Sequence, residues 1–233
     1  MVAGYPVLHQ ELFALFPMQS FWFDPYLWIH LAGLAALPLS LVLCMVGLAL
    51  GEPLLPVWLE YLLVAGMGSA PVVGMQLFRP FYIFSILAVA VKPEELTTNQ
   101  RQILSLFKKL QSRWLASASA LVLSVVLWPI YRWAPLASPL ASSLPQWRLL
   151  GLFVAALAFL FSNLFLQIPL SVLRLMLSSS AQFAAAEPMA PEQIRQQFSI
   201  LGWQVKKILP PLATSEPTLS KSETLPSPVS EPK

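Results

Sequence analysis

Residues 24–50 read DPYLWIHLAGLAALPLSLVLCMVGLAL, and no Asp, Glu, Lys or Arg follows Asp24 within them. A helix needs about 20 apolar residues to cross the hydrocarbon core of a bilayer, so this stretch is long enough to span one. Asp24 is a favourable N-cap residue, and Pro25 suits the first helical position, where its missing N–H costs nothing. Residues 26–50 are therefore predicted to form a transmembrane helix with His30 in its second turn.

The composition of the whole chain is also that of a membrane protein. Of its 233 residues, 57% are hydrophobic and only 11% are charged. In a soluble domain about a quarter of the residues are charged. We therefore predict an all-α integral membrane protein. No nucleic-acid partner is expected, because the net charge is only +3 and the basic residues do not gather with aromatic residues on one face.

Three more stretches are long and apolar enough to cross a bilayer: residues 54–78, 114–133 and 147–170. Together with the first they predict a four-span membrane domain over residues 24–177, preceded by an interfacial segment at residues 1–23. Residues 134–146, APLASPLASSLPQ, contain three prolines and no charged side chain. We expect them to form a short irregular connection between the third and fourth spans.

Residues 80–113 are predicted to form an interfacial and amphipathic segment. The run FYIFSILAVAV at residues 81–91 is too short to span a membrane, so we expect it to lie in the interface or against the bundle. Thr97 and Gln100 have the spacing of a capping box, which begins a helix. That helix has one apolar stripe, made of Ile103, Leu106, Phe107 and Leu110. It is predicted to be a cytoplasmic amphipathic helix.

The C-terminal part of the chain contains two segments of different composition. Residues 178–210 are predicted to be a cytoplasmic segment with one short helix in PEQIRQQF, residues 191–198. Beyond Pro210 the sequence consists mainly of Pro, Ser, Thr and Glu, a mixture that cannot bury enough apolar surface to offset the entropy of ordering. Residues 211–233 are therefore predicted to be a disordered low-complexity tail.

The basic residues predict an orientation in the membrane. Of the fourteen Lys and Arg residues, Arg132 and Arg148 fall on one predicted side, and the other twelve (14 − 2) fall on the side that both termini share. Positive charge collects on the cytoplasmic side of membrane proteins, so both termini are predicted to be cytoplasmic. Lys108, Lys109 and Arg113 form a basic patch that is expected to attract anionic lipid headgroups.

Four polar residues inside the predicted spans are candidates for a functional site: His30, Glu60, Asn163 and Gln167. A helix rises about 1.5 Å per residue, which puts Asn163 and Gln167 at the depth of His30. We predict a polar cluster in which His30 forms a hydrogen bond to the fourth span. Chlorophyll or haem ligation by His30, or a proton relay, is the alternative.

Glu60 lies near the opposite surface, roughly 20 Å from His30 by the same rise per residue, so the two cannot pair. It is predicted to be an isolated carboxylate that reaches headgroups or water, and a cation site is the alternative.

Small residues recur at every fourth position in three spans, which allows helices to approach closely in lipid. We predict a helix-packing seam made of Ala32, Ala36, Ser40, Gly66, Ala70, Gly74, Ala116 and Ala120. Such a seam either holds the four helices of this chain together, which we favour, or docks a partner membrane protein.

The sequence contains no H-E-x-x-H, G-x-S-x-G, P-loop or G-x-G-x-x-G motif. No catalytic residue, metal site or cofactor is therefore predicted. The favoured function is a non-enzymatic accessory subunit or assembly factor of a membrane complex. The alternatives are a pigment-binding protein, or a small ion or solute carrier built around Pro38, residues 66–71 and Glu60.

Several motifs occur in an order that resembles a cyanobacterial family of low-complexity tail membrane proteins. They are FWFDPYLWIHLAGLAALPL, GEPLLPVWLE, LFRPFYIFS, QWRLLGL, SNLFLQIPLSVLR and KILPPL, the last of which precedes the Pro/Ser/Glu tail. The likeness covers about residues 20–212. It implies a thylakoid or plasma membrane location in a photosynthetic bacterium, and it implies no catalytic residue.

Overall fold

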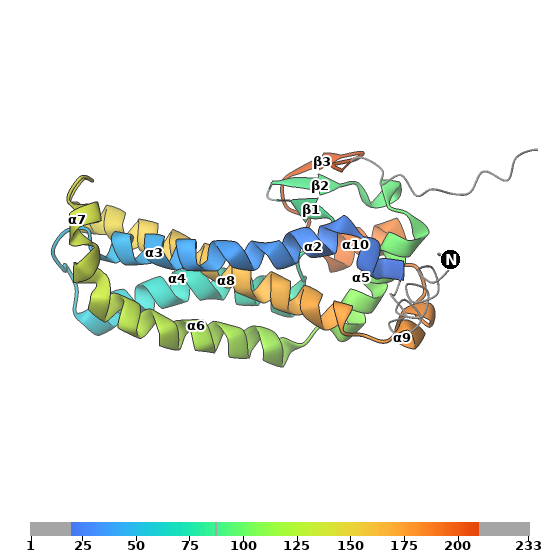
Figure 1. Ribbon diagram of the computed structural model, residues 1–233, viewed down its shortest axis with the longest axis horizontal. Coiled ribbons are helices and arrows are strands. Elements are labelled where there is room, and N and C mark those ends of the chain that lie inside the picture. The colour runs from blue at the N-terminus through green and yellow to red at the C-terminus, as the bar shows by residue number, and fades with distance from the viewer. Residues whose placement is uncertain (1–19, 87, 210–233) are drawn as a thin grey trace, which may run out of the picture.

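The computed structural model describes residues 20–86 and 88–209, and four long apolar helices form one bundle in it (Figure 1). Each is long and apolar enough to cross a membrane. Their bounds are Pro25–Leu48, Val57–Phe78, Arg113–Ala141 and Arg148–Met176. These bounds agree with the predicted spans to within a few residues at most ends, and the prediction of four such helices is confirmed.

The first span consists of three consecutive pieces, α2 (Pro25–Ala32), the 3-10 helix η2 (Gly33–Ala36) and α3 (Leu37–Leu48). The tightened turn lies just before Pro38, because proline has no N–H to bond to the carbonyl one turn earlier. Asp24 caps α2 as predicted, since its side chain accepts a hydrogen bond from the Tyr26 N–H at 3.0 Å. Gln100 also donates to Asp24, which ties this end of the span to the segment after the second span.

The other spans surround α8 (Arg148–Met176), which contacts α3, α4 (Val57–Phe78) and α6 (Arg113–Trp133). After Trp133 the chain continues through the 3-10 helix η4 (Ala134–Ala137) and α7 (Ser138–Ala141). The prediction of an irregular connection is therefore wrong for residues 134–141. Pro135 and Pro139 each stand in the first turn of a new helical piece, where proline is tolerated.

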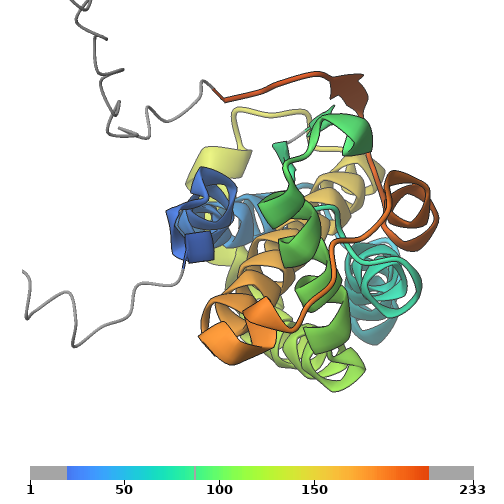
Figure 2. The same ribbon diagram turned by 90° about the vertical axis from the view of Figure 1, so that its right-hand side faces the viewer.

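The end of the bundle opposite α7 is covered by residues 79–86, 88–112 and 177–209, which we call the cap (Figure 2). Its elements are β1 (Ser85–Ile86), β2 (Val89–Val91), η3 (Pro93–Glu95), α5 (Thr98–Leu110), α9 (Ser180–Ala184), α10 (Pro191–Gln197) and β3 (Trp203–Val205). The short 3-10 helix η1 (Ser20–Phe23) lies beside α5. The helix predicted in residues 191–198 is confirmed as α10.

The cap contains a three-stranded sheet, so the all-α prediction is wrong here. β1 pairs antiparallel with β2, with Ser85 opposite Ala90, and β2 pairs parallel with β3, with Val89 opposite Trp203. Residues 81–91 are rich in β-branched and aromatic side chains that favour strands. The third strand comes from beyond the fourth span, and Gly202 before it has a φ of +87°, which suits glycine.

Two hydrophobic cores hold the molecule together. One lies within the bundle and includes Cys44, Val64 and Phe159, whereas the other lies beneath the cap and includes Tyr82 and Phe198. In α5 the predicted apolar stripe faces the core, because Ile103, Leu106 and Phe107 are buried and Leu110 is half-buried, and the predicted capping box of Thr97 and Gln100 is formed. The predicted tail at 211–233 and residues 1–19 lie outside the described part of the chain.

Candidate functional site

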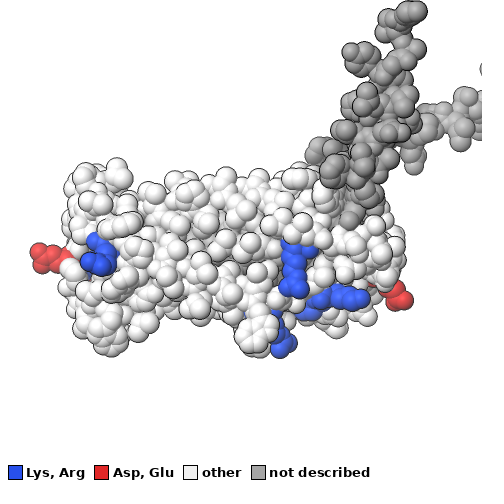
Figure 3. All heavy atoms as spheres, turned by 60° about the horizontal axis from the view of Figure 1, so that its bottom comes forward, with Lys and Arg blue, Asp and Glu red and all other residues white. Residues whose placement is uncertain are grey.

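Charged side chains lie near the two ends of the molecule. On the face seen in Figure 3, a wide band without charged side chains separates a cluster of Lys and Arg near the cap from a smaller charged group near α7. A band of this kind fits the hydrocarbon core of a bilayer, where ionised groups are costly. The bundle therefore has the charge distribution of a membrane domain.

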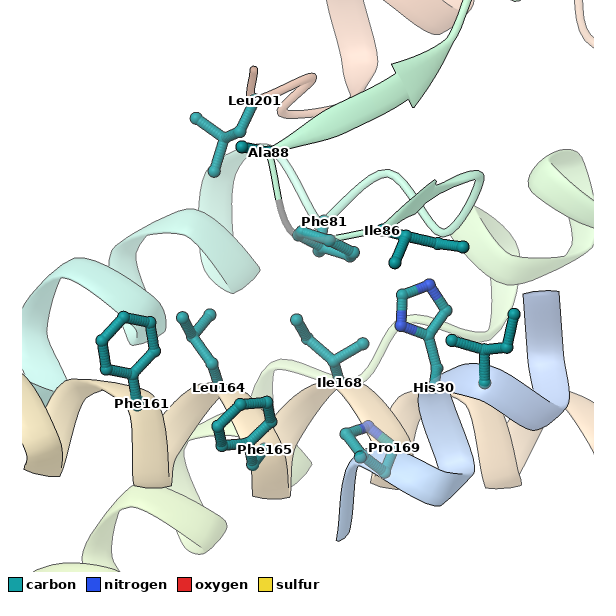
Figure 4. Close-up of a pocket in the computed structure, with 12 residues that line it drawn as sticks. His30, Phe81, Ile86, Ala88, Phe161, Leu164, Phe165, Ile168, Pro169 and Leu201 are labelled. Carbon is teal, nitrogen blue, oxygen red and sulfur yellow. The ribbon is translucent and has the colours of Figure 1, made fainter. Parts of the chain in front are cut away.

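An apolar cavity of about 530 Å³ lies between the first span, α8 and the cap (Figure 4). Pockets that hold small molecules in proteins usually measure about 300–1,000 Å³. The cavity is lined by Ile29, His30, Gly33, Phe81, Ile86, Ala88, Phe161, Leu164, Phe165, Ile168, Pro169 and Leu201. His30 supplies the one polar side chain among these lining residues.

Three apolar side chains on the lining of the cavity are exposed. Ile29 is 36% exposed, Phe161 is 41% exposed and Leu201 is 54% exposed. They come from α2, from α8 and from the turn before β3. The cavity therefore meets the outer surface of the protein among apolar side chains.

His30 stands at one end of this cavity. Its Nε2 lies 2.7 Å from the backbone oxygen of Ile83, and its ring meets the ring of Phe81 edge-on with the centroids 5.5 Å apart. Both partners belong to the cap. His30 therefore joins the first span to the cap.

The predicted cluster of His30 with Asn163 and Gln167 is wrong. Asn163 Nδ2 donates to the backbone oxygen of Phe159, and Gln167 Nε2 donates to Asn163 Oδ1 at 3.1 Å. Both amides are buried, whereas α8 presents Phe165, Ile168 and Pro169 to the cavity that His30 lines. The prediction considered depth along the helix axis, but the direction in which each side chain leaves the helix decides which residues meet.

The prediction that Glu60 is an isolated carboxylate is also wrong. Its side chain is fully buried near α7 and forms an ion pair with Arg148, whose Nε lies 3.0 Å from Glu60 Oε1. Tyr131 donates its hydroxyl to Glu60 Oε2 at 2.6 Å, and the backbone N–H of Leu54 donates to Oε1 at 3.1 Å. Both carboxylate oxygens of Glu60 therefore accept hydrogen bonds from groups of this chain, and the guanidinium group of Arg148 balances the negative charge.

Arg148 completes this site. Its Nη1 donates to the backbone oxygens of Leu48 and Leu50, at 2.7 and 3.2 Å. Glu60, Tyr131 and Arg148 lie on α4, α6 and α8, and Leu48 ends α3, so one polar network joins all four spans. The sequence contained a signal for the pair, because Glu60 and Arg148 both lie in the first turn of a span that begins at the same predicted surface.

The predicted seam of small residues is correct for part of its length. Ser40, Ala116 and Ala120 are buried inside the bundle, and Ser40 Oγ lies 2.9 Å from Ser162 Oγ. Ala36 is half-buried and Ala32 is exposed. A close approach of α3 and α8 occurs instead at Gly47 and Gly151, which the prediction missed.

The three predicted seam residues of α4 face away from the bundle, which contradicts the prediction that they hold this chain together. No described atom lies within 4 Å of a Cβ placed on Gly66 or Gly74, and Ala70 between them is exposed. Gly68 is the glycine of α4 that faces inward, and it lies against Phe159. Position around the helix, which the spacing alone did not fix, explains the difference.

The predicted basic patch of Lys108, Lys109 and Arg113 lies where α5 meets α6. Burial lowers the pKa of the Lys108 ammonium, and the positive charges of Arg113 and Arg79 lower it further. Within the described ranges, the ion pairs are Glu60 with Arg148 and Glu94 with Arg195. The patch therefore has no acidic partner in that part of the chain.

A family model described as low-complexity tail membrane protein-like matches residues 23–210. No curated protein and no solved structure matches the chain. Among the residues that the structure describes, no three His, Cys, Asp or Glu side chains gather in a group that could hold a metal ion.

Proposed function

We propose that this chain, which belongs to the low-complexity tail membrane protein-like family, is a non-enzymatic membrane protein that binds the apolar part of a lipid-soluble molecule. The cavity between the first span, α8 and the cap carries this proposal. Its lining is almost entirely hydrocarbon, which is the kind of lining that accommodates the apolar part of a small molecule. Its exposed apolar rim favours entry from the bilayer.

The purified protein should bind a fluorescent fatty-acyl probe, and Leu164→Trp should weaken that binding about tenfold, because the larger side chain fills the cavity. Leu121→Trp is the matched control, since Leu121 lies on α6 and is 66% exposed. Fluorescence titration in detergent measures both. Equal affinity of the two variants and the wild type would show that the probe binds elsewhere, and the proposal would fail.

The accessory role predicted from the sequence is a second proposal, and the outward face of α4 supports it. Gly66, Ala70 and Gly74 leave a shallow strip on this span, and such strips let a second helix approach closely in lipid. The partner we propose is a transmembrane helix of another membrane protein, in a complex of a cyanobacterial thylakoid or plasma membrane. The protein would then act as an accessory subunit or assembly factor.

Replacing both Gly66 and Gly74 by leucine should abolish comigration with a larger complex on native gels after mild solubilisation. Leucine favours a helix more than glycine does, so the span itself should remain intact. Ala118→Leu on the exposed face of α6 is the control and should leave comigration unchanged. Wild-type protein that migrates as a free small oligomer would contradict this role.

We also propose the orientation predicted from the basic residues, with both termini and the cap in the cytoplasm. The basic patch would then face the anionic lipids of the cytoplasmic leaflet. In intact cells that hold the protein in their plasma membrane, a membrane-impermeant maleimide should label Ser142→Cys beyond α7 and should label Ser179→Cys in the cap only after permeabilisation. Both serines are exposed, whereas the native Cys44 is buried. The reverse labelling pattern would overturn the orientation.

A further inference from the structure

We propose that the ligand of the apolar cavity is a lipid-soluble alcohol whose hydroxyl group donates a hydrogen bond to His30 Nδ1. This inference rests on the proposed function and specifies its ligand class. It starts from the composition of the cavity, in which eleven of the twelve lining side chains are hydrocarbon or absent and His30 is the remaining one. A ligand that fits this lining is apolar except for one group beside His30.

The partner of Nε2 fixes which ring nitrogen carries the proton. A backbone carbonyl oxygen can only accept a hydrogen bond, so the contact between Nε2 and the Ile83 oxygen at 2.7 Å requires a proton on Nε2. In the neutral imidazole, Nδ1 is then an acceptor with a free lone pair. No described residue forms a hydrogen bond with Nδ1.

The ring is held so that this acceptor faces the cavity. The bond to Ile83 and the edge-on contact with Phe81 fix the ring against the cap. Figure 4 shows the imidazole at the end of the cavity, with one nitrogen toward Ile86 and the other turned into the space beside Ile168. The second nitrogen follows the ring carbon that bears the side chain, and is therefore Nδ1.

A fixed acceptor in a hydrocarbon cavity selects between polar groups. A hydroxyl group satisfies Nδ1 and loses little on leaving water, because it exchanges one hydrogen bond for another. An ether, ester or ketone oxygen has no proton to donate, so it would leave both itself and Nδ1 unpaired, which is unfavourable. The cavity should therefore prefer an alcohol to its methyl ether, although the two have nearly the same shape and apolar surface.

Competition between hexadecanol and hexadecyl methyl ether for the fluorescent acyl probe tests this inference. With wild-type protein in detergent, hexadecanol should displace the probe at a concentration about three- to tenfold lower than the ether does, which is the range expected from one neutral hydrogen bond. His30→Leu should remove this preference. His30→Gln should retain most of it, because a glutamine amide can donate to the Ile83 oxygen and accept from the ligand.

The outcomes separate this inference from the function on which it rests. Equal displacement by the alcohol and the ether in wild-type protein would overturn the inference and leave apolar-ligand binding intact. Displacement by hexadecanoate alone would show that charge selects the ligand, and the alcohol would be wrong. A wild-type protein that binds no probe would overturn both proposals. If His30→Leu fails to fold, the preference for the alcohol over the ether can still be compared between the wild type and His30→Gln, and that comparison decides the result.

Discussion

Replacing Arg148 by leucine should lower the free energy of unfolding by about 3–5 kcal/mol, the range found when one partner of a buried ion pair is removed. The substitution leaves the Glu60 carboxylate fully buried with Tyr131 and backbone N–H groups as its remaining donors. It also leaves the backbone oxygens of Leu48 and Leu50 without the guanidinium group that binds them. The connection between α3 and α4 should loosen with it.

Denaturant titration of helical signal in detergent measures this effect. Arg132→Leu is the matched control, because Arg132 lies near the same end of the bundle but is exposed, and it should change stability by less than about 1 kcal/mol. The double variant Glu60→Leu, Arg148→Leu removes both charges and should be more stable than Arg148→Leu alone. An Arg148→Leu protein as stable as the wild type would show that the pair does not stabilise the bundle.

A single methyl group on Gly151 should destabilise the protein by about 1–3 kcal/mol, the usual cost of overpacking a well-packed core. A Cβ at this position would lie 2.5 Å from the backbone oxygen of Gly47 and 2.8 Å from the Cβ of Leu50. The first of these atoms belongs to the backbone of α3 and cannot rotate away. Gly151→Ala should therefore push α3 and α8 apart at this contact.

Gly66→Ala should not destabilise the protein, in contrast to Gly151→Ala. No described atom lies within 4 Å of a Cβ at Gly66, so alanine should be neutral or stabilise the helix by up to about 1 kcal/mol. The same denaturation assay compares the two variants. If Gly151→Ala and Gly66→Ala have equal stability, the close contact between α3 and α8 is not a determinant of stability.

Features that depend on neighbouring residues could be predicted from the sequence. Asp24 caps α2, and Thr97 with Gln100 caps α5, because each cap involves residues within three positions of one another. The spans were predictable for the same reason, since a bilayer requires a continuous apolar run of known length. The buried stripe of α5 follows from a repeat that a helix imposes on its own residues.

Features that depend on direction around a helix, or on distant segments, could not be predicted in the same way. Depth along the axis placed Asn163 and Gln167 beside His30, although these amides bond within α8. The partner of His30 is the backbone oxygen of Ile83. Every residue carries a backbone oxygen, so the sequence does not indicate which one a side chain will bond. The cavity depends on how the cap sits on the bundle, so its lining comes from segments as far apart as residues 29 and 201.

The position of Arg148 within the chain has a consequence for biosynthesis. Glu60 is synthesised 88 residues before the arginine that pairs with it, so the first two spans are complete before this ion pair can form. The pairing of β2 with β3 likewise cannot form until β3, which follows the fourth span, has been synthesised. Both ends of the bundle therefore close only when the last span and the segment after it have emerged from the ribosome. Shorter nascent chains should be open at both ends and sensitive to membrane proteases until synthesis reaches that point.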